Sequence, residues 1–129
     1  MSKAAVYFDL FNSKAEEFIK ELTTSFPDIK QFQTFRSGFS LLKNLDNKKP
    51  QDIFNTYVYI EYKDYILQRN EDFFLHNLVE FESTRKDQWL EFIANIRNIW
   101  KTLDEDNKDV IWKYFQVLVT LNEKCVNNT

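Results

Sequence analysis

Histidine and cysteine, on which many catalytic and zinc sites depend, are almost absent from this sequence. The chain has 129 residues with one histidine, His76, one cysteine, Cys125, and one glycine, Gly38. A Ser-His-Asp or Cys-His arrangement would have to use His76, which has no cysteine near it in the sequence. One His and one Cys cannot supply the usual zinc ligand sets, and one glycine cannot form a glycine-rich phosphate loop. We therefore predict no catalytic residues, no metal site and no cofactor, and we expect that the protein is not an enzyme.

Cys125 lies on the apolar side of the last predicted helix. A reactive thiol needs a basic activator, and no conspicuous one stands beside this residue. We interpret Cys125 as a small buried hydrophobe. A single cysteine also cannot form a disulfide within the chain, which fits a reducing compartment.

Four acidic residues gather near the start of the same helix: Asp104, Glu105, Asp106 and Asp109. Calcium binding is one interpretation, but the stretch lacks the central glycine and the twelfth-position glutamate of an EF-hand loop. Carboxylates at a helix start can cap free N–H groups and face the positive end of the macrodipole. We therefore predict that this cluster starts a helix and holds no metal.

Lys43, Lys48 and Lys49 surround a predicted turn and could contact the phosphates of a nucleic acid. They are interleaved with Asp46, as in an ordinary solvated loop. The net charge of −3 gives the whole protein a field that mildly repels phosphate. Nucleic-acid association is therefore an alternative hypothesis, and we expect it to be the weaker one.

Aromatic residues make up 17% of the chain, which is more than one small core is expected to hide. Exposed Trp and Tyr are typical anchors of protein interfaces. The tyrosines at residues 57–65 form a candidate partner-binding face: Tyr57, Tyr59, Tyr62 and Tyr65. The three tryptophans are expected to add to this contact surface: Trp89, Trp100 and Trp112.

These side chains must be positioned by helices, and the last helix, Asp104 to Cys125, is predicted to be the central one. Its apolar residues recur at a three-four spacing: Ile111, Tyr114, Phe115, Leu118, Leu121 and Cys125. Further apolar residues leave only a narrow polar stripe. A helix that is apolar over most of its circumference has neighbours on several sides.

Two further helices are predicted before residue 50. The first spans about Asp9 to Ser25, although Ser13 followed by Glu16 has the form of a capping box that would start it a turn later. Pro27 ends it. The second runs from about Ile29 to Leu45. Gly38 falls in its middle, and either it admits a close neighbour or it breaks the helix; we favour the close neighbour, because the apolar register continues.

The middle of the chain is harder to assign. Pro50 begins a third helix over residues 50–58. Residues 57–62 alternate as a strand does, but no comparable strand exists to pair with them. We expect this stretch to extend the third helix or to form an irregular link, followed by short helical pieces at 64–68 and 72–75.

The segment around residues 69–85 is the most loop-like, and 77–83 has no clear period. A long helix is then expected from a cap at Ser83 or Thr84 to about Leu103, with Trp89 and Trp100 on its buried stripe. A short connection joins it to the last helix, so the two should pack antiparallel. We predict an all-α, single-domain bundle of about five helices covering residues 1–129. No run approaches the length of a membrane span, and we expect no membrane association.

The hydrophobic pattern is accompanied by short phrases such as SFPD (residues 25–28), KKP (48–50) and IWKYF (111–115). On these features, most of the chain, least so residues 76–88, resembles short helical proteins of uncharacterised role in large DNA viruses of algae and protists. The resemblance implies a viral origin and a non-enzymatic role, but no site residues. We therefore expect a non-catalytic interaction module, structural or accessory, in the virion or host cytoplasm. Its partners would be viral or host proteins, and it could also form homo-oligomers.

Overall fold

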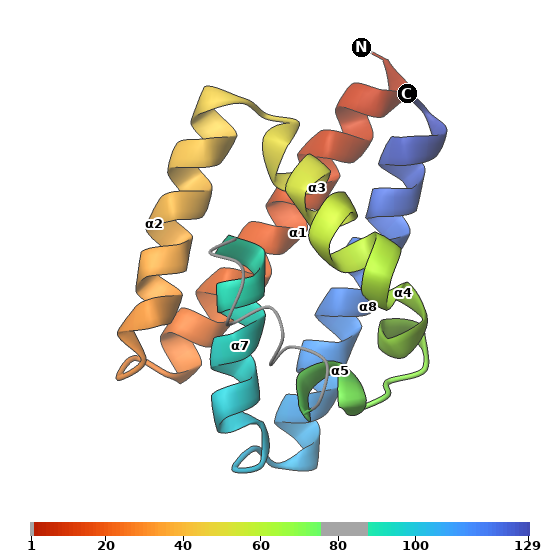
Figure 1. Ribbon diagram of the computed structural model, residues 1–129. Coiled ribbons are helices and arrows are strands. Elements are labelled where there is room, and N and C mark those ends of the chain that lie inside the picture. Colours follow the sequence, from red (N-terminus) through yellow and green to blue (C-terminus); the bar gives the residue numbers. More distant parts are fainter. Residues whose placement is uncertain (1, 76–87) are drawn as a thin grey trace.

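The computed structural model describes residues 2–75 and 88–129, which form a bundle of helices with no strand among them (Figure 1). A π-helical segment, η1 (Asn55–Tyr59), joins two of the helices. The α-helices are α1 (Lys3–Ser25), α2 (Lys30–Leu45), α3 (Lys49–Phe54), α4 (Ile60–Leu67), α5 (Asp72–Leu75), α7 (Gln88–Trp100) and α8 (Glu105–Asn127). The predicted all-α bundle is confirmed. With α3, η1 and α4 taken as one continuous helix, the described residues contain five long helices and the one-turn α5.

The first helix begins six residues earlier than predicted. The Ser2 hydroxyl oxygen accepts a hydrogen bond from the Ala5 backbone N–H at 3.2 Å and so provides the N-cap. Asp9 and Ser13, the two predicted starts, both lie within the helix. The helix ends at Ser25, before Pro27, as predicted.

Gly38 does not interrupt α2, which is continuous from Lys30 to Leu45. A Cβ at this glycine would lie 3.2 Å from the side-chain amide nitrogen of Gln88, the first residue of α7. The helix therefore does not break at Gly38, and the atoms nearest to the position of a Cβ belong to the end of one flexible side chain.

The strand-like stretch 57–62 is helical, as an extension of the third helix. Buried side chains recur at every fourth residue through α3, η1 and α4: Pro50, Phe54, Val58, Tyr62 and Ile66. Four residues of an α-helix turn through about 400°, so each of these side chains would drift about 40° from the previous one. A π turn holds more residues and reduces that drift. This four-residue spacing was visible in the sequence and favours a π turn. The prediction from helical periodicity did not take it into account.

Helices α7 and α8 run in opposite directions and are joined by a short turn (Figure 1). Leu103, in this turn, is buried just beyond the end of α7. However, α8 packs most extensively along α1, and α7 packs mainly against α2 and α5. The expected caps Ser83 and Thr84, and the stretch 77–83, lie outside the described residues.

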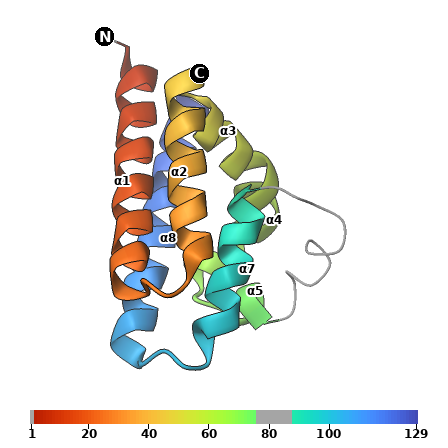
Figure 2. The same cartoon turned by 90° about the vertical axis from the view of Figure 1, so that its left-hand side faces the viewer.

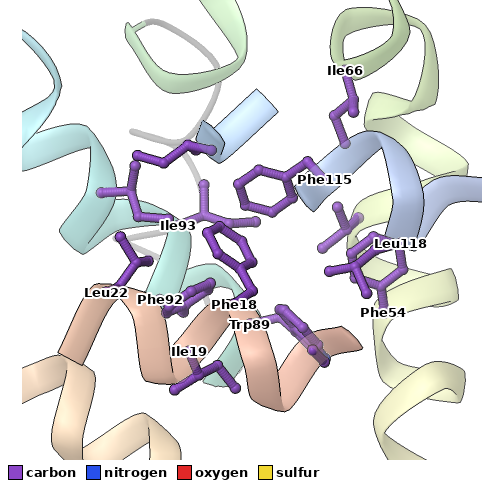
Figure 3. Close-up of a cluster of buried hydrophobic side chains, with 14 of the residues drawn as sticks. Phe18, Ile19, Leu22, Phe54, Ile66, Trp89, Phe92, Ile93, Phe115 and Leu118 are labelled. Atoms are coloured by element: carbon purple, nitrogen blue, oxygen red, sulfur yellow. The ribbon is translucent and has the colours of Figure 1, made fainter. Parts of the chain in front are cut away.

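Aromatic rings form most of the core (Figure 3). Phe18, at the centre, packs edge-on against Phe92 and Phe115, with ring centroids 5.3 and 5.1 Å apart, respectively. It also stacks on Tyr114 at 4.8 Å. One residue of α1 thereby joins α7 and α8.

All three tryptophans are buried. The buried stripe expected for Trp89 and Trp100 is therefore confirmed, and the expectation that the tryptophans contribute to an exposed contact surface is wrong. For two of them, Trp89 and Trp100, the indole N–H has an acceptor, as a buried tryptophan usually requires. Trp89 donates to the Pro50 carbonyl at 3.1 Å, and Trp100 donates to the Glu71 carboxylate. Trp112 packs against Trp100, with ring centroids 5.4 Å apart.

Candidate functional site

The four tyrosines of residues 57–65 do not share one environment. Tyr62 is buried and packs on Phe73, with ring centroids 5.4 Å apart. Tyr57, Tyr59 and Tyr65 are half-buried and rest against the core. Tyr62 therefore belongs to the core, and the prediction that it contacts a partner is corrected. The other three keep part of their surface accessible.

Tyr59 is positioned by polar contacts with α8. Its hydroxyl donates to Glu123 Oε1 at 3.0 Å, and Lys63 Nζ lies 3.8 Å from the same oxygen. The Lys63 ammonium also lies 5.4 Å from the centre of the Tyr59 ring. Burial, and secondarily the Glu123 carboxylate, raises the pKa of Tyr59. The phenol is therefore protonated at neutral pH and can act as a hydrogen-bond donor.

A chain of three amides fixes α3 and η1 against α8 beneath these tyrosines. Gln51 Nε2 donates to Asn122 Oδ1 at 2.7 Å, and Asn122 Nδ2 donates to Asn55 Oδ1 at 2.9 Å. Asn122 is fully buried, so both ends of its amide need these partners. Sequence reasoning missed this network, because no spacing along one helix reveals an amide pairing between two.

Two aliphatic side chains on the same segment project into solvent. Ile60 is 67% exposed and Leu67 is 46% exposed. Their separation of seven residues places them on the same side of the helix. We call these two residues and the half-buried Tyr59, which precedes Ile60 in the chain, the η1–α4 face. The sequence-based predictions did not include Ile60 or Leu67, although their seven-residue spacing was visible.

The three lysines that could contact phosphate have neighbours of their own. Lys43 Nζ lies 2.8 Å from the Glu16 carboxylate, and Lys49 Nζ lies 3.6 Å from that of Asp52. Lys48 Nζ lies 5.5 Å from the centre of the Phe8 ring. Two of these three charges are thus already balanced by carboxylates, which weakens any attraction for a nucleic acid.

The acidic cluster serves the helix start, as predicted. Asp104 is the N-cap of α8 and accepts from the Asn107 backbone N–H at 2.8 Å. Asp109 lies 2.6 Å from Arg69 and 3.0 Å from Lys113. These two hydrogen bonds, that of Arg69 first, lower the pKa of Asp109.

Cys125 is buried, as predicted, at a depression of about 400 Å³ between the start of α3 and the end of α8. Burial raises the pKa of its thiol to about 11. The thiol is therefore protonated at neutral pH and is not poised as a nucleophile. Lys48, Gln51 and Asn55 also line the depression.

His76 lies outside the described residues. Among residues 2–75 and 88–129, no three His, Cys, Asp or Glu side chains are grouped so that they could hold a metal ion. In the same part of the chain, no helix has the length and apolar character needed to cross a membrane. No protein-family model, curated protein sequence or solved structure matches the chain.

Proposed function

We propose that this protein is a non-catalytic helical module that binds another protein through the η1–α4 face. The observation that carries this proposal is the exposure of Ile60 and Leu67 on one side of a helical segment in which Tyr57, Tyr59 and Tyr65 are half-buried. Exposed apolar side chains beside aromatic rings are typical of interface anchors.

Hydrogen bonds to α8 hold in place the segment that carries this face. The amides of Gln51, Asn122 and Asn55 tie it to α8, as does the hydroxyl of Tyr59. A surface held in place before binding loses less conformational entropy when a partner arrives. The polar contacts therefore support recognition, although they contribute no partner contact themselves.

The resemblance to helical proteins of large DNA viruses supports a viral setting for this module. On that basis, we propose a structural or accessory role in the virion or the host cytoplasm, with viral or host proteins as partners. The alternative role on nucleic acid receives less support, because Lys43 and Lys49 are engaged by carboxylates.

The test is affinity capture of the tagged protein from infected cells, with the captured proteins identified by mass spectrometry. The double variant Ile60→Lys, Leu67→Lys removes the apolar character of the face without touching a buried side chain. Leu45→Lys is the matched control, because Leu45 is 85% exposed and lies on α2, outside the η1–α4 face.

We expect a partner that is retained by the wild type and by Leu45→Lys but lost by the double variant. Circular dichroism should show equal helix content in all three proteins. Equal recovery of every captured protein by all three would contradict the assignment of this face. Parallel mass spectrometry of purified virions tests whether the protein is packaged.

A further inference from the structure

Helices α1 and α8 lie side by side and antiparallel, and α1 forms one edge of the bundle (Figures 1 and 2). Helix α2 packs on the inner flank of α1, and α4 packs on the opposite flank of α8. On each of the two helices, one line of residues therefore lies beside the α1–α8 contact on the surface of the bundle. We call these two lines the outer seam. This outer seam does not include the η1–α4 face.

The line on α8 follows the alternating spacing of four and three residues that is found in helices that pack against other helices. Its members are Val110, Tyr114, Val117, Leu121 and Lys124. Val110 and Val117 are 42% and 39% exposed, and Tyr114 and Leu121 are half-buried. Four of its five positions are thus apolar or aromatic and partly open to solvent.

The line on α1 has the same spacing. Its members are Lys3, Tyr7, Leu10, Lys14, Glu17 and Glu21. Leu10 is 44% exposed, and Tyr7 is half-buried. The stacking of Phe18 on Tyr114 shows which flank of α1 meets α8. Glu17 and Glu21 lie close enough to Tyr114 to raise its pKa, after the larger effect of burial, so the two lines are neighbours.

Charge is distributed unequally along this seam. At the end where the two termini lie, α1 contributes Lys3 and α8 contributes Lys124 (Figure 1). Towards the other end, α1 contributes Glu17 and Glu21. Lys14 pairs with Glu17 at 3.0 Å and marks the boundary between the two halves. The seam is therefore basic at one end, apolar in the middle and acidic at the other end.

We propose that a second copy of this chain docks on the outer seam and forms a two-fold symmetric dimer. A two-fold axis perpendicular to the helices turns the second copy end for end. The basic end of each copy then faces the acidic end of the other, and the apolar middles meet. An isologous interface must be complementary to itself, and this charge order satisfies that condition. The dimer would pack two α1–α8 pairs face to face as an antiparallel four-helix bundle.

The oligomeric state tests the proposal, measured by light scattering coupled to size-exclusion chromatography at low salt. We expect the wild type to have twice the 15.6 kDa mass of the chain. Val117→Lys should return it to the monomer mass. Leu45→Lys and the double variant Ile60→Lys, Leu67→Lys should remain dimeric, because they leave the outer seam unchanged. A monomeric wild type at its highest soluble concentration would overturn the proposal.

Two charge-reversal variants test the orientation. Lys3→Glu with Lys124→Glu makes both ends acidic, whereas Glu17→Lys with Glu21→Lys makes both ends basic. Each variant alone should be a monomer with unchanged helix content, since like charges then face each other. Mixed in equal amounts, the two should recover the dimer mass, because an acidic seam complements a basic one. Dimers of either variant alone, or a mixture that stays monomeric, would refute this two-fold arrangement.

Discussion

On the side of α8 that faces α1, the contacts are made by aromatic rings, whereas on the side that faces α3, η1 and α4, many of them are polar. Phe18 illustrates the first side, since it packs on both Tyr114 and Phe115. The amides of Asn122 and Gln116 illustrate the second, since they bond to Gln51 and to the backbone of α4, respectively. Apolar burial is strong and undirected, but hydrogen bonds fix one geometry. We infer that the first side supplies most of the stability and the second fixes the register of the η1–α4 face.

The largest expected effect comes from the aromatic side. Phe18→Ala removes a fully buried ring that joins α1 to α7 and α8 and should cost about 3–5 kcal/mol in the free energy of unfolding. Urea denaturation followed by tryptophan fluorescence measures it. Phe18→Leu, which keeps most of the volume, should lose distinctly less. A loss below about 1 kcal/mol for Phe18→Ala would show that the aromatic side is not the main source of stability.

On the polar side, Asn122→Ala leaves both Gln51 and Asn55 without their amide partner. The expected cost is about 1–3 kcal/mol, because desolvated polar groups are left unpaired. The same denaturation experiment measures this cost. Thr120→Ala, at an exposed position of the same helix, is the control, and it should change the free energy of unfolding by no more than about 0.5 kcal/mol. If Asn122→Ala proves as mild as Thr120→Ala, the amide chain does not fix this contact.

Two substitutions of Arg69, at the end of α4, distinguish the effect of backbone strain on stability from the effect of charge pairing. Its φ of 52° lies in the left-handed region, which glycine adopts freely and other residues do not. Arg69→Gly and Arg69→Ala both remove the contact with Asp109, but only glycine relieves the strain. Arg69→Gly should therefore be more stable than Arg69→Ala by about 1 kcal/mol. Thermal unfolding of both variants tests this difference, and equal stabilities would argue against strain.

The effect that is smallest at neutral pH concerns Cys125, because it appears only in alkali. The pKa of its thiol is about 11 in the folded protein, above its ordinary value of 9.0. Above pH 9 the unfolded state therefore releases this proton while the folded state keeps it, so the thiol makes stability fall as the pH rises. For this one proton, the free energy of unfolding cannot fall by more than about 1.4 kcal/mol per pH unit. Unfolding curves from pH 8 to about 10.5 should fall less steeply for Cys125→Ala than for the wild type. Equal slopes would show that the thiol is not shielded.

Periodicity predicted the helices well wherever a single apolar face dominates. The end of α1 and both ends of α2 fall within a residue of the expected positions, and α8 extends two residues beyond its expected end. Prediction failed where the deciding feature lay outside the apolar pattern or departed from its usual period. The Ser2 hydroxyl starts α1 early, and the fourfold spacing of Phe54, Val58 and Tyr62 was not recognised as the mark of a π segment.

The sequence predicted a candidate partner-binding face at residues 57–65, but it did not indicate which side chains there are accessible. Tyr62 packs on Phe73 and is buried in the core. Ile60, in contrast, is the most exposed apolar side chain of that segment, and no sequence pattern had indicated it. Accessibility depends on neighbouring elements, and a local pattern does not contain that information. Trp89 and Trp100 show the same limitation, because their indole N–H groups are paired with the distant Pro50 carbonyl and Glu71 carboxylate.

The sequence alone determined that this chain is helical and that its last helix has neighbours on several sides, because a 3.6-residue period of apolar side chains is a local property. The tertiary structure decided which polar groups pair. The Gln51, Asn55 and Asn122 amides meet across 67 and 71 residues of sequence, and Arg69 reaches Asp109 across 40. Such pairings follow from how helices are placed against one another. They determine which side chains remain open to a partner.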